Sequence, residues 1–167
     1  MQKIKVFDGD ITKLDVDAIV NAANKSLLGG GGVDGAIHRA AGRQLLEECR
    51  TLHGCQTGEA KITKGYNLPA RHVIHTVGPV YSGIASDSVN LSNCYKNSLD
   101  IARGNDLHSV AFPSISTGVY GYPMDKAADV AISTVRKWLE DNSDYDMEIT
   151  FCTFGDKATK VYEERLS

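Results

Sequence analysis

The sequence is organised around residues 21–35, which read Asn-Ala-Ala-Asn-Lys-Ser-Leu-Leu-Gly-Gly-Gly-Gly-Val-Asp-Gly. A glycine within regular structure costs about 0.5–1 kcal/mol relative to alanine, so a run of glycines does not serve stability. Residues 16–20 before the run are apolar except for Asp17 and predict a short buried strand, and apolar residues recur at helical spacing from residue 33. A glycine-rich turn from a strand into a helix exposes backbone N–H groups at the positive end of the helix, which suits an anion such as phosphate.

The rest of the chain alternates between predicted strands and predicted helices. Strands are expected at residues 4–7, 16–20, 59–63, 72–77, 109–113 and 148–152, and helices at 33–50, 90–103, 123–139 and 157–166. This alternation favours an α/β fold with helices on both faces of a largely parallel sheet. Because there is no internal repeat and no long linker, residues 1–167 are expected to form one domain.

A second glycine-bearing loop, residues 114–122, has the same position relative to its neighbours. It reads Ser-Ile-Ser-Thr-Gly-Val-Tyr-Gly-Tyr, follows the predicted strand 109–113, and precedes Pro123, a residue favoured in the first turn of a helix. In open α/β sheets such loops gather at the carboxyl edge of the strands, where ligands bind. Two amide-rich loops facing each other could hold two phosphates. The residues alone therefore predict a nucleotide or diphosphate ligand.

Composition excludes several other classes of function. The formal net charge is −3 and no Lys/Arg-rich run occurs, which argues against binding of a nucleic-acid polymer but not against a small phosphorylated ligand. The four cysteines form no CxxC pair, no histidine completes a zinc spacing, and Cys94 and Cys152 lie in apolar patterns. The five histidines have no predicted partner and are interpreted as ordinary core or surface residues. With no signal peptide or membrane-spanning run, the expectation is a cytoplasmic protein without a metal site.

Three well-known motifs fit poorly. Gly30-x-Gly32-x-x-Gly35 formally matches a dinucleotide-binding fingerprint, but residues 21–28 separate it from the strand and no acid ends a second strand at the required distance. A Walker A loop needs Gly-Lys-Ser/Thr, whereas Gly35 precedes Ala36. No Gly-x-Ser-x-Gly nucleophile elbow is present.

Each polar residue of these loops also has a purely structural interpretation. Asp10 could accept a hydrogen bond from a ligand amino group, but capping a short turn is the favoured interpretation. Asn21 and Asn24 are typical turn residues, and Asp34 could simply stabilise a helix N-terminus by about 0.3–1 kcal/mol. Because all of these explanations would have to hold together, a ligand site is favoured over them.

The chain resembles the macrodomain family, and specifically its MacroD-like branch. Two motifs carry the resemblance: Asn24 followed by Gly31-Gly32-Val33-Asp34, and Gly118-Val119-Tyr120-Gly121. Further matching stretches lie at residues 9–12, 20–24, 75–79 and 111–118, so the resemblance covers nearly the whole chain. It implies a three-layer α/β/α sandwich around a mixed, largely parallel sheet, with ADP-ribose bound in a cleft at the sheet edge.

The resemblance also implies roles for individual residues. Asp10 would accept the adenine amino group, with the Ile11 amide beside it, and Phe154 would stack on adenine, a common way to hold a base. Asn24 would orient the distal ribose. The complete expected ADP-ribose site consists of Asp10, Ile11, Asn21, Asn24, Gly31, Gly32, Val33, Asp34, Ser116, Thr117, Gly118, Val119, Tyr120 and Phe154.

Members of this branch remove ADP-ribose from acidic side chains of mono-ADP-ribosylated proteins and deacetylate O-acetyl-ADP-ribose. The resemblance therefore implies a hydrolase without a metal or cofactor, with Asn24 and Asp34 as catalytic residues. A monomer is the default expectation for a compact domain. Asp34 is the only acid in the two motifs, so it could activate or hold a water, while a paired-carboxylate glycosidase mechanism is not supported. The alternative is a module that binds ADP-ribose without turnover, since a fold alone does not specify function. Regulation of an RNA-processing partner has no supporting motif.

Overall fold

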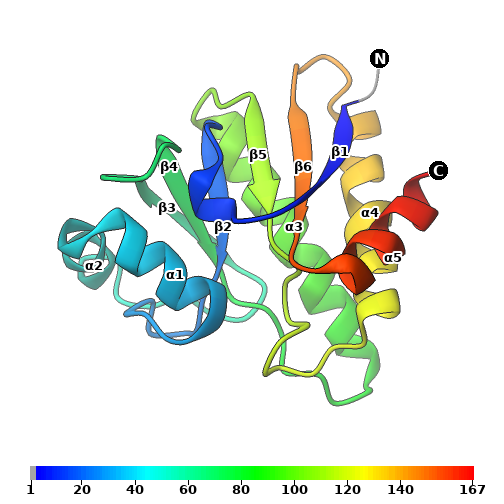
Figure 1. Ribbon diagram of the computed structural model, residues 1–167, viewed down its shortest axis with the longest axis horizontal. Helices are drawn as coiled ribbons and strands as arrows, with labels where there is room; N and C mark the ends of the chain where they lie inside the picture. The colour runs from blue at the N-terminus through cyan, green and yellow to red at the C-terminus, as the bar shows by residue number, and fades with distance from the viewer. Residues whose placement is uncertain (1–2) are drawn as a thin grey trace.

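The computed structural model describes residues 3–167 and contains one six-stranded sheet (Figure 1). Its strand order is β1-β6-β5-β2-β4-β3, and every neighbouring pair is parallel except β3 and β4, which are antiparallel. The predicted mixed, largely parallel sheet is confirmed. The strands are β1 (Ile4–Asp8), β2 (Ala18–Ala22), β3 (Ala60–Lys64), β4 (His72–Thr76), β5 (Ser109–Phe112) and β6 (Glu148–Thr153).

Strand β2 lies between β4 and β5 and begins two residues later than predicted. It also runs on to Ala22, so Asn21 belongs to the strand and not to the loop after it. In the parallel register with β4, Asn21 pairs with His75. Residues directly opposite each other on neighbouring strands point to the same face, so this register places the two polar side chains together.

The helices form two layers, one on each face of the sheet. The first core cluster unites Val20, Ile74 and Phe112 with residues of the helices α3 (Ala85–Gly104), α4 (Met124–Asp141) and α5 (Asp156–Leu166). The second unites the alternate strand residues Ile19 and Val73 with the helices α1 (Gly32–Ala41) and α2 (Arg43–Arg50) and with the short 3₁₀ turn η1 (Ile11–Lys13). Figure 1 shows α1 and α2 well separated from α3 and α4, with the sheet between them. The three-layer sandwich is confirmed.

Two predicted helices differ from those observed. The single helix expected over residues 33–50 is two helices, because Gly42 adopts φ +94° and ends α1. Helix α3 begins at Ala85, before the predicted start at residue 90. Its Asp87 side chain accepts hydrogen bonds from the backbone N–H groups of Ser82 (2.9 Å) and Gly83 (2.8 Å), which fixes the start of the helix by polar contacts and not by an apolar pattern.

The remaining expectations about the core concern single residues. Cys94 and Cys152 are buried as predicted, and all four cysteines are free thiols. Pro123 stands at the N-cap of α4, one position before the first helical residue. Over residues 3–167, no helix combines the length and the apolar character needed to cross a bilayer.

Candidate functional site

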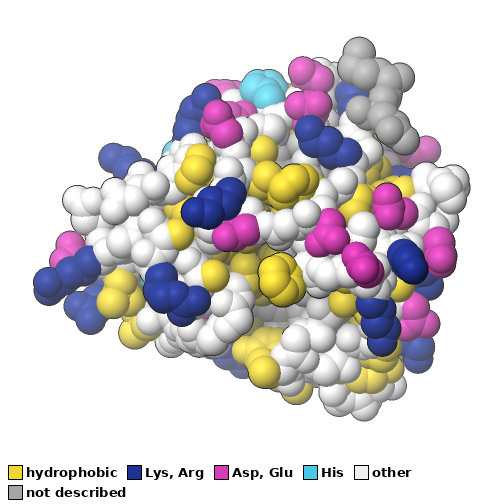
Figure 2. All heavy atoms as spheres, viewed as in Figure 1, with side chains coloured by type: hydrophobic (Ala, Val, Ile, Leu, Met, Phe, Trp, Pro, Cys, Tyr) yellow, Lys and Arg dark blue, Asp and Glu magenta, His cyan; other side chains and the backbone are white. Residues whose placement is uncertain are grey.

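A cavity of about 860 Å³ lies at the carboxyl edge of the sheet, between the two glycine-bearing loops. In Figure 2, which views the molecule from the same side as Figure 1, apolar side chains flank a hollow near the middle of the face. All of the residues expected to bind ADP-ribose line this cavity except Asn21. Further lining residues that sequence reasoning did not identify are Gly9, Ala22, Ala23, Gly30, Ala36, Gly78, Pro113, Ser114, Met124, Cys152 and Ala158.

The topology brings the two loops together, because β2 and β5 are parallel neighbours and end at the same edge. Gly78, just after β4, allows the second loop to pack closely on the sheet. A Cβ there would overlap the Ser116 hydroxyl and lie 2.7 Å from Ile115 Cγ2. The second loop closes on itself through hydrogen bonds from Tyr122 N to Ser116 O (2.9 Å) and from Gly121 N to Gly118 O (3.0 Å).

The first loop delivers the N-terminus of α1 to the cavity. The first N–H groups of a helix have no acceptor within the helix, and α1 begins with Gly32, Val33 and Asp34, all on the cavity wall. Gly31 is the N-cap residue and makes no side-chain cap. Gly35 is needed for close packing, since a Cβ there would overlap the Gly30 carbonyl oxygen. These exposed N–H groups and the positive end of the helix favour an anionic ligand.

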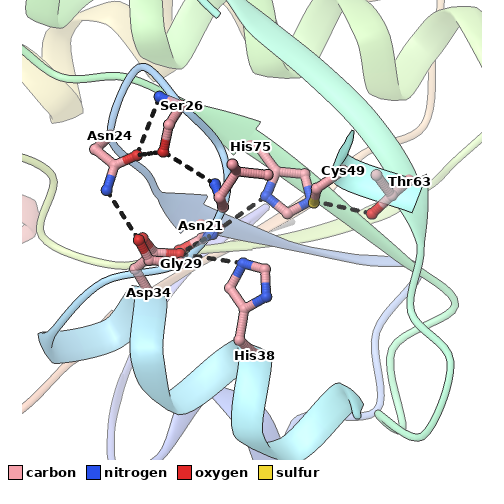
Figure 3. A network of polar contacts seen from close by, with 10 residues as sticks. Asn21, Asn24, Ser26, Gly29, Asp34, His38, Cys49, Thr63 and His75 are labelled. Atoms are coloured by element: carbon pink, nitrogen blue, oxygen red, sulfur yellow. Dashed lines mark hydrogen bonds and ion pairs between the residues drawn. The ribbon is translucent and has the colours of Figure 1, made fainter. Parts of the chain in front are cut away.

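Asn24 holds the glycine loop in place. Its Nδ2 donates to the Gly29 carbonyl (3.0 Å), and its Oδ1 accepts from Ser26 N (3.1 Å) and Ser26 Oγ (2.6 Å) (Figure 3). The turn role that the sequence allowed is therefore present. An amide nitrogen carries two hydrogens, so one Nδ2–H remains for a group in the cavity that Asn24 lines.

Asp34 presents a carboxylate at the cavity wall while its side chain is held from within the protein. The residue is only 4 % exposed, and its Oδ1 accepts from Asn21 Nδ2 at 2.8 Å. His38, one helical turn further along α1, places Nε2 3.5 Å from the same oxygen. Among residues 3–167, no hydrogen-bond donor contacts the other oxygen, Oδ2. Asp34 is therefore fixed through one oxygen and has the second available.

Asn21 and His75 form a polar support that sequence reasoning missed. Asn21 is fully buried and contacts the Asp34 carboxylate, so it lies behind the cavity wall and not on it. His75 is also fully buried, and its Nδ1 lies 3.2 Å from Asn21 Nδ2. Burial, followed by the proximity of His38, lowers the pKa of His75 to about 3. The one available signal was an Asn and a His in neighbouring buried strands, which becomes informative only when the register is known.

Asp10 and Phe154 also line the cavity, although both lie far from Asp34 in the sequence. Asp10 Oδ1 accepts from Thr12 Oγ1 (2.7 Å) and Thr12 N (2.9 Å), so the predicted cap is confirmed. These hydrogen bonds lower the pKa of Asp10, and the one from the Thr12 hydroxyl has the larger effect. Phe154 is 89 % exposed and Val119 99 % exposed, although both line the cavity. Two large apolar side chains therefore stand free at its rim.

Comparison with known proteins gives the same family from sequence and from structure. The Macro domain family model matches residues 20–131. The ADP-ribose glycohydrolase MACROD1 of Rattus norvegicus is 59 % identical over 167 residues, which cover 99 % of this chain and 65 % of the relative. The Macro domain-containing protein mll7730 of Mesorhizobium japonicum is 58 % identical over 163 residues, covering 97 % of this chain and 92 % of the relative.

The chain spans between about half and two thirds of the length of the MACROD1 relatives it matches. Among solved structures, the Trypanosoma brucei macrodomain in complex with ADP-ribose superposes with a TM-score of 0.92 at 49 % identity, covering 99 % of this chain and 69 % of that chain. The Oceanobacillus iheyensis macrodomain with ADP gives a TM-score of 0.90 at 45 % identity, covering 96 % and 88 %. The chain belongs to the macrodomain family.

Proposed function

We propose that this protein is an ADP-ribosyl ester hydrolase. Its substrates are O-acetyl-ADP-ribose and proteins that carry mono-ADP-ribose on acidic side chains. The observation that carries the proposal is the Asp34 carboxylate, almost fully buried, anchored through Oδ1 by Asn21, and set in the wall of a cavity between two glycine loops. The relatives named ADP-ribose glycohydrolases and the neighbour solved with ADP-ribose support the ligand class.

The cavity offers a separate group for each part of ADP-ribose. The diphosphate would lie between the α1 N-terminus and the loop over residues 116–120, both rich in backbone N–H groups. The adenine would stack on Phe154, with its amino group donating to Asp10. The distal ribose would then lie beside Asn24, whose free Nδ2–H can donate to a ribose hydroxyl.

Both substrates carry an acyl ester on the distal ribose, so hydrolysis needs one activated water. The water oxygen bonds to the acyl carbon, the ester C–O bond breaks, and the departing ribose oxygen takes up a proton. Asp34 accepts the proton from the water, or holds the water while a substrate phosphate accepts it. General-base assistance contributes about 10²–10⁴-fold, and correct orientation adds to it. In this scheme the reaction proceeds with a single carboxylate and no metal ion.

The test compares turnover with binding in the same variants. Wild type should release ADP-ribose from a glutamate-modified protein. Asp34→Ala should lower turnover by about 10²–10⁴-fold, while calorimetry shows that free ADP-ribose still binds. Asn24→Ala should lower both, because Asn24 also holds the glycine loop. Glu164→Ala, an exposed acid on α5, serves as the matched control. Wild type that binds ADP-ribose but hydrolyses neither ester would establish the non-catalytic binding module instead.

We further propose that residues 1–167 act as a single macrodomain, monomeric and located in the cytoplasm. Four free, buried thiols suit a reducing compartment. Light scattering on the purified protein tests the oligomeric state.

A further inference from the structure

A line of buried polar side chains leads from Asp34 into the interior of the sheet (Figure 3). Asp34 Oδ1 accepts from Asn21 Nδ2 at 2.8 Å, and the same nitrogen lies 3.2 Å from His75 Nδ1. His75 Nε2 lies 3.0 Å from Thr63 Oγ1. Asn21 and His75 are fully buried and Thr63 is 2 % exposed, so no water competes for these contacts. The proposed ester hydrolysis assigns no role to this line beyond Asp34.

The hydrogens of this line can be assigned from the contacts. Asn21 Nδ2 carries two hydrogens and no acceptor, so one can go to Asp34 and the other to His75 only if His75 Nδ1 carries no proton. The neutral imidazole then has its proton on Nε2, which donates to Thr63 Oγ1. The Thr63 hydroxyl in turn donates a hydrogen bond to the Lys64 carbonyl oxygen (3.1 Å). Every hydrogen in the line has an acceptor.

The reverse orientation of the Asn21 amide is unfavourable. It would place Oδ1 against the Asp34 carboxylate oxygen, which can only accept a hydrogen bond. In the observed orientation Asn21 Oδ1 is buried without a hydrogen-bond partner in the described part of the chain. Leaving a buried acceptor unpaired costs about 1–3 kcal/mol. The contact of Nδ2 with Asp34 therefore decides how the amide is turned, and the second Nδ2 hydrogen then faces His75 Nδ1.

Burial, followed by the proximity of His38, lowers the pKa of His75 and keeps the ring neutral. His38 of α1 has its ring centroid 6.4 Å away, and Cys49 of α2 places Sγ 3.8 Å from Nε2. Asp34, the nearby carboxylate, is separated from the ring by the Asn21 amide. A proton on Nδ1 would face the NH₂ group of Asn21 and break the line.

We propose that His75 is a positioning residue for the ester hydrolysis. The proposal rests on the proposed function. As the Nε2–H tautomer, His75 holds the Asn21 amide so that its other hydrogen points at Asp34 Oδ1. Asp34 then keeps one orientation and leaves Oδ2 for the water. A displacement of about 1 Å at a reacting group can lower a rate about 10²-fold, so loss of the Nδ1 acceptor should reduce kcat about 10- to 100-fold.

Two substitutions separate positioning from mere packing. His75→Asn keeps an acceptor oxygen near the place of Nδ1, whereas His75→Gln puts its amide near the place of Nε2 and lacks the Nδ1 acceptor. His75→Gln should lose about 10- to 100-fold in kcat, His75→Asn should stay within about 3-fold of wild type, and neither should change KM or ADP-ribose affinity by more than about 3-fold. Thr63→Val, which removes only the acceptor of Nε2–H, is the matched control and should resemble His75→Asn.

Equal kcat losses in the Gln and Asn variants, or no loss in either, overturn the positioning role. A second measurement does not depend on the folding of variants. Long-range ¹H–¹⁵N spectra of the wild-type imidazoles at about neutral pH should show His75 protonated on Nε2, and a proton on Nδ1 overturns the proposal. The turnover assay on wild type distinguishes failure of the proposed function from failure of the role of His75. Absence of wild-type turnover rejects the proposed function itself, whereas turnover together with the Nδ1–H tautomer rejects the role of His75 alone.

Discussion

At the residue scale, Gly31 gives a direct test of the glycine loop. A Cβ at Gly31 would meet no protein atom within 4 Å, and its φ of −89° is accessible to any residue. Gly31→Ala should therefore leave the free energy of unfolding within about 0.5 kcal/mol of wild type. If the ligand approaches this backbone closely, ADP-ribose affinity should fall at least about tenfold, a loss of about 1.4 kcal/mol. Calorimetric titration combined with urea unfolding measures both, and an unchanged affinity would remove Gly31 from the site.

The two glycine loops and the polar support behind Asp34 differ in how far the sequence predicts them. Each loop is local, because Asp34 and the glycines of the first loop lie within residues 29–35 and the glycines of the second lie at 118 and 121. The support is not local, because Asn21 and His75 meet only through the register of β2 and β4. His38 is an intermediate case. Its spacing from Asp34 places it one helical turn away, so the pair could have been predicted once the helix was assigned.

At the scale of elements, all six strands follow from short segments that are either mostly apolar or alternate between polar and apolar residues, and the errors lie at boundaries. The apolar spacing over residues 33–50 continues through both α1 and α2, so it did not reveal the break at Gly42. The start of α3 depends on contacts between Asp87 and the backbone of residues 82–83, which no hydrophobic period records. Both errors arise where a single backbone conformation or a polar cap overrides the pattern.

A matched pair of glycine substitutions tests this account of the helix boundaries. Gly42 has φ +94° and ψ 176°, a conformation that other residues rarely adopt, and a Cβ there would lie 2.9 Å from Asn67 Nδ2. Gly42→Ala should lower the free energy of unfolding by about 1–3 kcal/mol. Gly104, the last residue of α3, has open space around it and no positive φ, so Gly104→Ala should raise stability by about 0.4–1 kcal/mol. Similar effects of the two substitutions in urea unfolding would show that backbone conformation does not separate α1 from α2.

At the scale of the whole molecule, alternation of strands and helices was sufficient to predict the layers and the parallel sheet. The strand order was not predictable in the same way, since β1 pairs with β6 from the far end of the chain. This long-range order gathers the ends of β2, β4, β5 and β6 at one edge. It also encloses His75 in the sheet interior, which makes the stability of the whole domain depend on pH.

Stability should fall as the pH drops below about 6.5. The pKa of His75 is about 3 in the folded protein and 6.5 when exposed, so between these values only the unfolded chain binds the proton. The contribution of His75 to the free energy of unfolding is complete above pH 6.5. It is lost at about 1.4 kcal/mol per pH unit as the pH falls toward 3, which amounts to about 2 kcal/mol between pH 6.5 and pH 5. Carboxylates whose pKa is lowered in the folded protein, such as those of Asp10 and Asp87, change the stability only below about pH 4.

Urea unfolding at several pH values, on wild type and on His75→Asn, measures this dependence. The variant should show a shallower slope between pH 6.5 and pH 5. Parallel slopes in the two proteins would mean that His75 takes up no proton on unfolding.

We expect Asp34 to face the distal ribose of ADP-ribose bound between the two loops. A crystal structure of the wild-type protein with ADP-ribose tests it most directly. The diphosphate should lie on the backbone amides of residues 31–33 and 116–120. The distal ribose should lie within about 2.6–3.2 Å of Asn24 and Asp34, directly or through one water. A distal ribose turned into solvent, with Asp34 contacting only Asn21 and His38, would contradict it.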